Sequence, residues 1–375
     1  MKIRAAVLDA MQQPRPYAQS RPIKVETVIL DSPGPGEVLV KIAAAGLCHS
    51  DLSIVNGDRP RPMPMALGHE AAGIVEELGP GVSDLHRGDH VALIFVPSCG
   101  CCGPCMEGRP ALCEPGAAAN GAGTLVGGQR RLHRGDGSLL NHQVGVSCFA
   151  EYAVVARGSL VKIDPELPFD IAALFGCAVL TGVGAVVNAA QLRLGATLAV
   201  VGLGGVGLSA LLGAQAAGAK QVVAIDSLAA KLDLAHALGA SHCFRADDPD
   251  LLARVKGVTA GGVDAAVEAA SSVAALETAY KITRRGGITV TCSLPHPDHA
   301  FKLQAVNLVA EERTLKGSYL GSAVPSRDIP RFIALYRAGR LPVERLVSHR
   351  LVLEDINLGF DRLAEGAAVR QVIMF

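Results

Sequence analysis

The sequence predicts an α/β protein in which a doubly wound parallel sheet is joined to a second, β-rich domain. At 375 residues the chain is too long for one comfortable hydrophobic core. Half of it is hydrophobic and 19% is charged, so it can bury a large apolar surface. The pattern also changes along the chain, from β-rich runs to alternating strands and helices. We therefore expect one domain from residues 1–178 with 322–375, and a second from residues 179–321.

The N-terminal part reads as strands broken by Pro-Gly pairs such as Gly79-Pro-Gly81. Strands are expected at Lys24–Leu30, Glu37–Ala45, Ala72–Glu77 and His90–Phe95. The glycine-rich segment 114–141 is expected to be a long loop, and a connection of that length rarely lacks a function.

From about Thr181 strands alternate with helical stretches, the pattern of a doubly wound parallel sheet. Expected strands are Leu198–Gly202, Gln221–Asp226, Val263–Ala269 and Gly287–Ser293, and expected helices are Gly205–Ala217, Leu228–Leu238 and Ala274–Ile282. After about Gly321 the rhythm becomes irregular, so we expect the tail to return to the first domain.

Charge and hydropathy argue against nucleic-acid and membrane partners. The formal net charge is +0 and the pI is near 7.1, which provides no basic surface for an anionic polymer or membrane. Two uncharged stretches, Ile171–Leu192 and Leu194–Ala219, approach the length of a membrane span. Both are rich in Gly and Ala, so buried α/β elements are the better interpretation. The first residues show no apolar leader, and we expect a cytoplasmic protein.

A dinucleotide site is indicated by the G-x-G-x-x-G pattern that follows an expected strand and opens an expected helix. Its residues are Gly202, Gly204, Gly205, Val206 and Gly207. Asp226 ends the next strand, where an acid that binds the adenosine ribose belongs in a Rossmann fold. Its charge would repel a 2′-phosphate, so NAD is expected rather than NADP. A glycine turn used only for packing is the alternative.

Five of the ten cysteines lie between Cys99 and Cys113. The spacing of four of them suits a tetrahedral all-thiolate zinc site, which leaves no position for substrate and is therefore structural. These four are Cys99, Cys102, Cys105 and Cys113. Cys101 falls outside the frame and is interpreted as a spare thiol. A redox cluster or disulfides are the alternatives.

A second, dispersed set consists of Cys48, His69 and Cys177. Two thiolates and one imidazole with an open fourth position would make a catalytic zinc site. Each residue alone has a simpler explanation, since a buried cysteine usually acts as a small hydrophobic residue. The interpretation of these three as one site depends on the resemblance described next.

The stretch Gly68-His69-Glu70-x-x-Gly73-x5-Gly79-x-x-Val82 resembles the signature of zinc alcohol dehydrogenases in the medium-chain dehydrogenase/reductase family. The four-cysteine segment, the glycine-rich loop and Val369-Arg370 resemble the family in the same order over the whole chain. The resemblance implies a GroES-like catalytic domain, a Rossmann domain, NAD as cofactor, and two zinc ions per chain, one catalytic and one structural.

The resemblance also implies roles for individual residues. Cys48, His69 and Cys177 would bind the catalytic zinc, Asp51 would orient His69, and Glu70 would lie behind the metal. The residues expected to contact NAD are Thr181 and Val206 at the nicotinamide, His49 and Arg370 at the pyrophosphate, and Lys231 at the adenosine ribose. Phe95 and Tyr319 would face the substrate.

The implied reaction is hydride transfer between a primary alcohol, aliphatic or aromatic, and NAD, with zinc acting as a Lewis acid. Ser50 is expected to accept the alcohol proton. Many relatives have a histidine three residues further on, which passes the proton outward. Here the position is Ser53, which cannot act as a base near neutral pH, so we expect another route.

Two alternatives remain open at this point. One is oxidation of S-(hydroxymethyl)glutathione, but that branch has an acidic residue near the place of Arg59 and an arginine near Ala117, and this chain has neither. The other is a non-enzymatic zinc protein that uses the four-cysteine segment for interaction. The zinc-free quinone reductases are excluded because all three catalytic ligands are present.

The remaining histidines show no ligand spacing and are expected at the surface or as satisfied structural residues; they are His86, His90, His133, His142, His236, His242, His296, His299 and His349. Arg130, Arg131 and Arg134 form a basic patch, interpreted as a solvated face. We expect a homodimer formed through a strand near Arg313–Leu320.

Overall fold

The computed structural model describes all 375 residues, which divide into two compact units. Unit 1 consists of Met1–Cys177, Val324–Pro330 and Glu344–Phe375, and unit 2 of Ala178–Ala323 and Arg331–Val343. The sequence prediction had assigned 331–343 to the first domain. Helix α12 (Pro325–Arg337) begins in unit 1, and from Arg331 onward its residues belong to unit 2.

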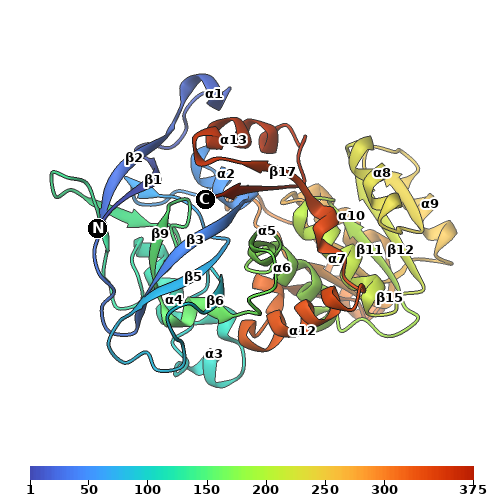
Figure 1. The fold of residues 1–375 in the computed structure, drawn as a ribbon. Coiled ribbons are helices and arrows are strands. Elements are labelled where there is room, and N and C mark those ends of the chain that lie inside the picture. Colours follow the sequence, from blue (N-terminus) through green and yellow to red (C-terminus); the bar gives the residue numbers. More distant parts are fainter. The chain divides into compact units, whose positions relative to one another are not determined.

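Unit 1 is built on β-structure (Figure 1). A closed barrel has the order β1-β2-β7-β8-β4, formed by β1 (Lys2–Leu8), β2 (Ile23–Leu30), β4 (Met65–Ala66), β7 (Leu132–His133) and β8 (Leu139–His142). A seven-stranded sheet contains β3 (Glu37–Leu47), β5 (Ala71–Leu78), β6 (His90–Leu93), β9 (Tyr152–Ala156), β10 (Leu160–Lys162), β17 (Val347–Leu351) and β18 (Arg370–Met374). The C-terminal strand β18 pairs antiparallel with β3, so the tail completes this sheet.

The helices of unit 1 are short, and several hold residues of the candidate site. They are α1 (Tyr17–Ser20), α2 (His49–Val55), α3 (Gly103–Met106), α4 (Glu114–Ala122), α5 (Phe169–Leu174) and α13 (Ile356–Ala364). Successive side chains of a strand point to opposite faces of the sheet. Val40, Ile42 and Leu47 of β3 contribute to one buried hydrophobic core.

The expectation of a long loop at 114–141 is wrong for half of that segment. Residues 114–122 form α4, and β7 and β8 form an antiparallel hairpin within the barrel. Cys113 caps the start of this helix, since its side chain accepts the Gly116 N–H, and Gly123 caps the end in the left-handed conformation at φ 67°. Glycine-rich composition concealed a helix that is capped at both ends.

Unit 2 is a six-stranded parallel sheet, as predicted. Its strands are β11 (Thr197–Val201), β12 (Gln221–Asp226), β13 (His242–Arg245), β14 (Val263–Glu268), β15 (Thr283–Thr291) and β16 (Thr314–Gly317), in the order β13-β12-β11-β14-β15-β16. The order reverses between β11 and β14, and ligands of open α/β sheets bind at such a point.

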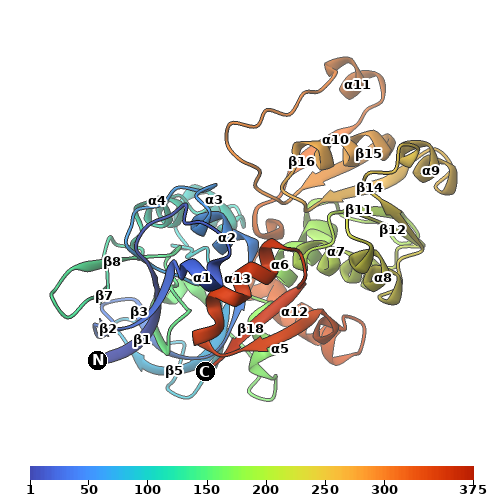
Figure 2. The same cartoon turned by 90° about the horizontal axis from the view of Figure 1, so that it is seen from above.

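Helices cover both faces of this sheet, with α7 and α8 on one side and α9 and α10 on the other (Figure 2). The helices of unit 2 are α6 (Ala178–Gly184), α7 (Gly205–Ala216), α8 (Ala229–Ala237), α9 (Leu251–Val258), α10 (Val273–Ile282) and α11 (Ala305–Ala310), with a π-helical turn at Ala185–Ala189. The two long uncharged stretches are thus divided among short elements. No helix has the length and apolar character needed to cross a bilayer.

Candidate active site

Three segments of unit 1 bring four potential ligands together. Cys48 precedes α2, His69 and Glu70 lie between β4 and β5, and Cys177 follows α5. One ligand atom from each of these four residues lies within 4.8 Å of the others, and all four side chains are buried. The structure therefore places the three sequence-predicted zinc ligands in one cluster, with Glu70 beside them.

His69 is oriented by Asp51. Oδ1 of Asp51 lies 2.6 Å from Nδ1 of His69, and its Oδ2 accepts the Cys48 N–H at 2.9 Å, which also caps α2. A carboxylate accepts, so Nδ1 carries the proton of this contact and Nε2 is the ring atom left for a ligand bond. Nε2 is buried without a partner. The His69 and Phe95 rings pack in a T-shaped arrangement, with ring centroids 5.4 Å apart.

The electrostatics of the cluster suit a divalent cation. A hydrogen bond from Cys177 lowers the pKa of the Cys48 thiol well below its ordinary value, and the same contact with burial raises the pKa of Cys177. Burial alone would lower the pKa of His69, but the charges of Asp51 and Cys48 raise it overall. The site thus favours a thiolate at Cys48. A divalent cation bound to both cysteine sulfurs and to Nε2 of His69 would satisfy all three ligand atoms.

Behind the cluster, Glu70 and Arg370 form a buried ion pair. Burial raises the pKa of Glu70, and the Arg370 charge opposes that shift. Oε2 of Glu70 and Nε of Arg370 lack partners within the protein. The structure places Arg370 at the start of β18. Its expected contact with the pyrophosphate stays a prediction.

The other residues expected near the metal lie on α2. Ser50 is in its first turn and is partly exposed. Ser53 donates its hydroxyl hydrogen to the backbone oxygen of His49 at 2.8 Å. The Ser53 hydroxyl hydrogen is therefore bound within the helix, and the route by which the proton leaves stays a prediction.

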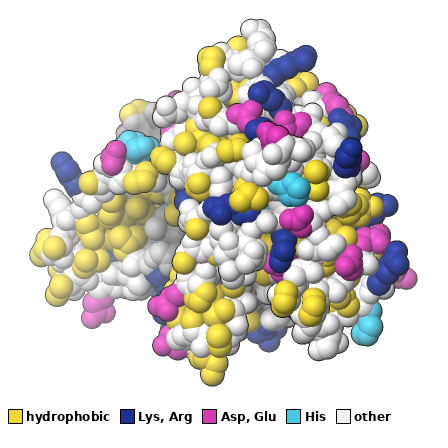
Figure 3. Space-filling view, turned by 90° about the vertical axis from the view of Figure 1, so that its left-hand side faces the viewer, with side chains coloured by type: hydrophobic (Ala, Val, Ile, Leu, Met, Phe, Trp, Pro, Cys, Tyr) yellow, Lys and Arg dark blue, Asp and Glu magenta, His cyan; other side chains and the backbone are white.

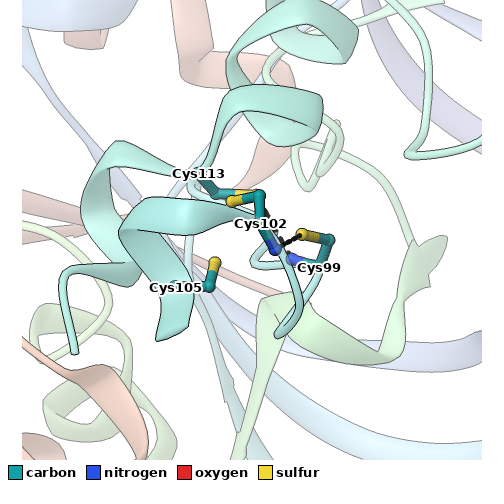
Figure 4. A group of neighbouring side chains, drawn as sticks. All are labelled: Cys99, Cys102, Cys105 and Cys113. Atoms are coloured by element: carbon teal, nitrogen blue, oxygen red, sulfur yellow. Dashed lines mark hydrogen bonds between the residues drawn. The ribbon is translucent and has the colours of Figure 1, made fainter. Parts of the chain in front are cut away.

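The four sequence-predicted thiols of the cysteine-rich segment converge around α3 (Figure 4). Their sulfurs lie within 4.8 Å of one another, and all cysteines in the chain are free thiols. Sulfurs about 2.3 Å from a tetrahedral zinc lie roughly 3.8 Å apart, so the group fits that ion. Backbone N–H groups of Cys101 and Cys102 lower the pKa of Cys99 to about 6, whereas burial raises that of Cys105 to about 12. Cys101 is exposed and lies outside the group.

In unit 2 the glycine-rich turn connects β11 to α7. Gly202 has φ 94°, and a Cβ at Gly207 would lie 1.8 Å from the Gly202 oxygen, so close packing demands glycine at both positions. Helix α7 begins at Gly205 and leaves its first N–H groups available for an anion. Thr181 is buried on α6, whose Gly182 packs against the Val206 backbone.

Asp226 ends β12 and lines a cavity of about 310 Å³ with Gly202, Ile225 and Ala270. Its carboxylate accepts the N–H of Leu203 at 2.7 Å and that of Leu228 at 2.9 Å. The acid therefore also fixes the two loops that border the cavity. Lys231 lies in the first turn of α8, and Tyr319 is 39% exposed at the short helix Tyr319–Ser322.

Sequence reasoning missed two buried polar residues. Glu268 ends β14 and accepts hydrogen bonds from Ala270 N, Thr291 Oγ1 and Ser293 Oγ at 2.6–2.7 Å. Gln143 follows β8 and contacts Asp51. No local pattern marks either residue, because the side chains that they bind are distant in the chain. Thr291 lies 23 positions from Glu268, and Asp51 lies 92 positions from Gln143.

The basic patch proves to be paired. Arg131 binds Glu37, Arg134 binds Glu26 and Asp9, and Arg130 binds Asn141. On the molecular face in Figure 3, Lys and Arg side chains lie among Asp and Glu side chains. Arg131 and Arg134 are partly exposed, in line with a solvated face, and their ion pairs also connect the hairpin to β3 and β2.

His142 departs from the expectation of satisfied structural histidines. It is fully buried, its Nε2 accepts the Arg131 N–H at 3.0 Å, and Nδ1 lacks a partner within the protein. Burial lowers its pKa to about 4, and the charges of Arg130 and Arg131 add to the effect. His142 is thus held in its neutral form.

Comparison with known proteins gives the family. Residues 34–165 match the family model of the alcohol dehydrogenase GroES-like domain, and residues 205–338 match that of the zinc-binding dehydrogenases. An NDMA-dependent alcohol dehydrogenase of Amycolatopsis methanolica is 38% identical, with 100% of this chain and 99% of that protein aligned. Alcohol dehydrogenase B of Mycobacterium tuberculosis is 37% identical over 95% of this chain and 96% of its own length.

Among solved structures, benzyl alcohol dehydrogenase of Acinetobacter calcoaceticus superimposes with a TM-score of 0.93 at 31% identity, over 100% of this chain and 99% of its own. The two family models match in the expected order along the chain, and the relatives align over nearly their whole length. The chain is an oxidoreductase that belongs to the zinc-dependent alcohol dehydrogenases of the medium-chain dehydrogenase/reductase family.

Proposed function

We propose that the protein is an NAD-linked alcohol dehydrogenase that interconverts a primary alcohol, aliphatic or aromatic, and its aldehyde. The observation that carries the proposal is the convergence of the Cys48 and Cys177 thiols on the buried, unpartnered Nε2 of His69. Three such ligands leave the fourth tetrahedral position of a zinc ion open for substrate.

The chain's own residues would act around that metal as follows. Zinc held by Cys48, His69 and Cys177 would supply a Lewis acid that lowers the pKa of an alcohol hydroxyl. Asp51 fixes the tautomer of His69, and the buried Glu70–Arg370 pair lies behind the ligands. Ser50 is proposed to accept the substrate proton from its place in the first turn of α2.

NAD is the proposed redox cofactor, and it would supply the acceptor for hydride. Asp226, at the end of β12, would bind both hydroxyls of the adenosine ribose and disfavour a 2′-phosphate. The start of α7 would receive the pyrophosphate. We propose further contacts from residues that the family resemblance implies, namely Thr181, Val206, His49, Lys231 and Arg370.

A second zinc is proposed in the four-cysteine group, where its role would be structural. All four protein ligands are sulfurs, so substrate would find no open position there. The similarity of the chain to a family of enzymes sets aside the alternative of a non-enzymatic zinc protein.

The substrate proposal is tested by a turnover screen with the zinc-loaded protein. Benzylic, aliphatic and secondary alcohols are supplied with NAD, and S-(hydroxymethyl)glutathione serves as a further substrate. Primary alcohols should give the highest kcat/KM. The relation to a benzyl alcohol dehydrogenase favours including the aromatic ones. Preference for the glutathione adduct or for secondary alcohols would contradict the proposal.

The electron acceptor needs its own test because one relative is named as NDMA-dependent. The same alcohols are assayed with NAD alone, with NDMA alone and with both. Turnover with NAD alone supports the proposed NAD-linked reaction. Turnover that requires NDMA would instead identify an activity like that of the Amycolatopsis relative.

We also propose a homodimer formed through β16. This strand is at the edge of the six-stranded sheet and pairs only with β15, and edge strands are templates for further pairing. Val306 and Val309 on the nearby α11 are 67% and 82% exposed. Sedimentation should give twice the mass of the 38.7 kDa chain, and Val309→Asp should weaken the association. A monomer at micromolar concentration would overturn this proposal.

A further inference from the structure

We propose that Gln143 is a positioning residue that holds His69 in place for the catalytic metal, acting through Asp51 and through the backbone at Gly68. The inference rests on the proposed zinc site. Its basis is a single buried carboxamide that connects the two segments on which His69 depends.

The Gln143 side chain is 2% exposed and uses both ends of its amide. Nε2 donates to Oδ1 of Asp51 at 2.6 Å, and Oε1 accepts the Gly68 N–H at 2.6 Å. Asp51 stands on α2, whereas Gly68 lies immediately before His69. The amide therefore bridges segments that are separated in sequence and that meet at the ligand.

The orientation of this amide follows from its neighbours. A carboxylate only accepts hydrogen bonds and a backbone N–H only donates them, so the NH2 group must face Asp51 and the oxygen must face Gly68. The reversed amide would place oxygen against carboxylate and hydrogen against hydrogen. Only one of the two amide orientations therefore satisfies both ends, so the orientation of the Gln143 side chain is fixed.

The bridge acts on the His69 ring through Asp51 and on the backbone of Gly68, the residue before His69. Oδ1 of Asp51 is shared by Gln143 Nε2 and His69 Nδ1, and Oδ2 is held by the Cys48 N–H. Three donors thus fix the carboxylate that directs the imidazole. The same glutamine accepts the N–H of Gly68, whose φ is 102° and which directly precedes His69.

Gln143 is itself anchored by the segment that follows β8. Its backbone N–H lies 3.0 Å from Ser147 Oγ, and that hydroxyl donates to the Ala66 oxygen at 2.8 Å. Ala66 ends β4, the strand that precedes His69. The support for the ligand therefore extends to the barrel, and it uses buried polar groups that the proposed chemistry does not otherwise need.

Two variants separate the two ends of the bridge. Gln143→Met keeps the length and volume but loses both hydrogen bonds. Gln143→Glu keeps an acceptor for Gly68 but replaces the donor to Asp51. The matched control is Gln371→Met, because Gln371 is an equally buried glutamine of unit 1 whose Nε2 donates to the Gly359 oxygen.

The measurement is zinc release from the full-length protein into a chromophoric chelator, with thermal unfolding recorded for each variant. The phase that belongs to the catalytic site is identified by its loss in His69→Ala. Both Gln143 variants should release this zinc about tenfold faster or more, since groups that orient metal ligands affect affinity by about 10- to 100-fold. Ligand-field bands of the cobalt-substituted protein should shift, and zinc release in Gln371→Met should match the wild type.

An unchanged catalytic phase and cobalt spectrum in Gln143→Met and Gln143→Glu would overturn the inference. Equal acceleration in Gln371→Met would do the same, because the effect would then be general loosening of unit 1. Failure of the proposed function looks different. In that case the wild-type protein would show no catalytic-site phase and no alcohol turnover.

Discussion

Asp51 and His69 form a buried contact in which Oδ1 and Nδ1 are 2.6 Å apart and the side chains are 0% and 2% exposed. Because the carboxylate can only accept, it selects the ring atom that carries a proton and leaves Nε2 facing two thiols. The orientation of the proposed metal ligand is thus set by a neighbouring carboxylate that would not itself bind the metal.

Asp51→Asn should weaken zinc binding at the catalytic site by about 10- to 100-fold. An asparagine amide can donate to Nδ1, which would put the ring proton on Nε2 and block the ligand position. Competition with a chelator of known affinity measures the change. Asp170→Asn is the control, since Asp170 is also a buried acid of unit 1 but pairs with Arg350. Equal zinc affinity in Asp51→Asn and the wild type would contradict the argument.

Cys105→Ser should reduce the zinc content from two ions per chain to one and lower the unfolding temperature. Loss of a single sulfur leaves three ligands, and structural zinc contributes on the order of 10 kcal/mol to the folding of small sites. Cys101→Ser is the matched control, because Cys101 lies in the same segment but outside the group of four. Metal analysis that shows zinc loss in Cys101→Ser and not in Cys105→Ser would assign the ligands differently.

How far the sequence leads depends on the distance between interacting residues. The alternation in unit 2 and the Gly202–Gly207 turn are local patterns, and both correspond to observed elements. The spacing from Cys99 to Cys113 is likewise local, and these sulfurs do meet. Hydrophobic periodicity and loop chemistry are set by neighbours in the chain, so they can be read without a structure.

The features that sequence reasoning missed depend on distant partners. Gly116 lets helix α4 lie close to the Pro97 carbonyl, since a Cβ at this position would be 2.2 Å from that oxygen. Composition does not reveal this close approach. The return of the tail to the first domain was expected, but the strand that it pairs with was not, and that pairing places Gln371 of β18 opposite Leu47 of β3. Gln143 acquires its partners only when residues 75 and 92 positions away fold against it.

His142 should make the stability of unit 1 depend on pH. Its pKa is about 4 in the folded protein, against about 6.5 when unfolded, because the buried ring is kept neutral. The unfolded chain therefore takes up the proton first as the pH falls. The stability that this neutral ring provides is present above pH 6.5 and is lost between pH 6.5 and 4, by at most about 3 kcal/mol.

The measurement is urea unfolding of wild type and His142→Gln across this pH range. The glutamine oxygen can still accept the Arg131 N–H, and a glutamine side chain at position 142 does not titrate. The wild type should lose more free energy of unfolding than the variant on acidification. Parallel pH dependences would show that His142 contributes nothing to acid sensitivity.

Asp226→Gly should shift cofactor preference from NAD toward NADP. Hydrogen bonds to a charged group are worth about 1.5–3 kcal/mol each, so kcat/KM with NAD should fall by about 10- to 100-fold or more. The Leu203 and Leu228 N–H groups also lose their acceptor, so Asp226→Asn is the milder companion that retains one. The ratio of kcat/KM for the two cofactors is the decisive quantity. An equal loss with both would show that Asp226 does not read the ribose.

Ser53→His should raise alcohol oxidation at neutral pH by several-fold. Position 53 is three residues after Ser50 on α2, so the two side chains lie on one helical face, and an imidazole there could carry the proton onward. The native Ser53 hydroxyl donates to the His49 oxygen, and we expect it to carry no proton in the reaction, so Ser53→Ala should retain wild-type kcat. Both variants are compared over a pH series with saturating alcohol and NAD. No gain in Ser53→His would count against this prediction, and a marked loss in Ser53→Ala would show that the native Ser53 hydroxyl takes part in the proton transfer.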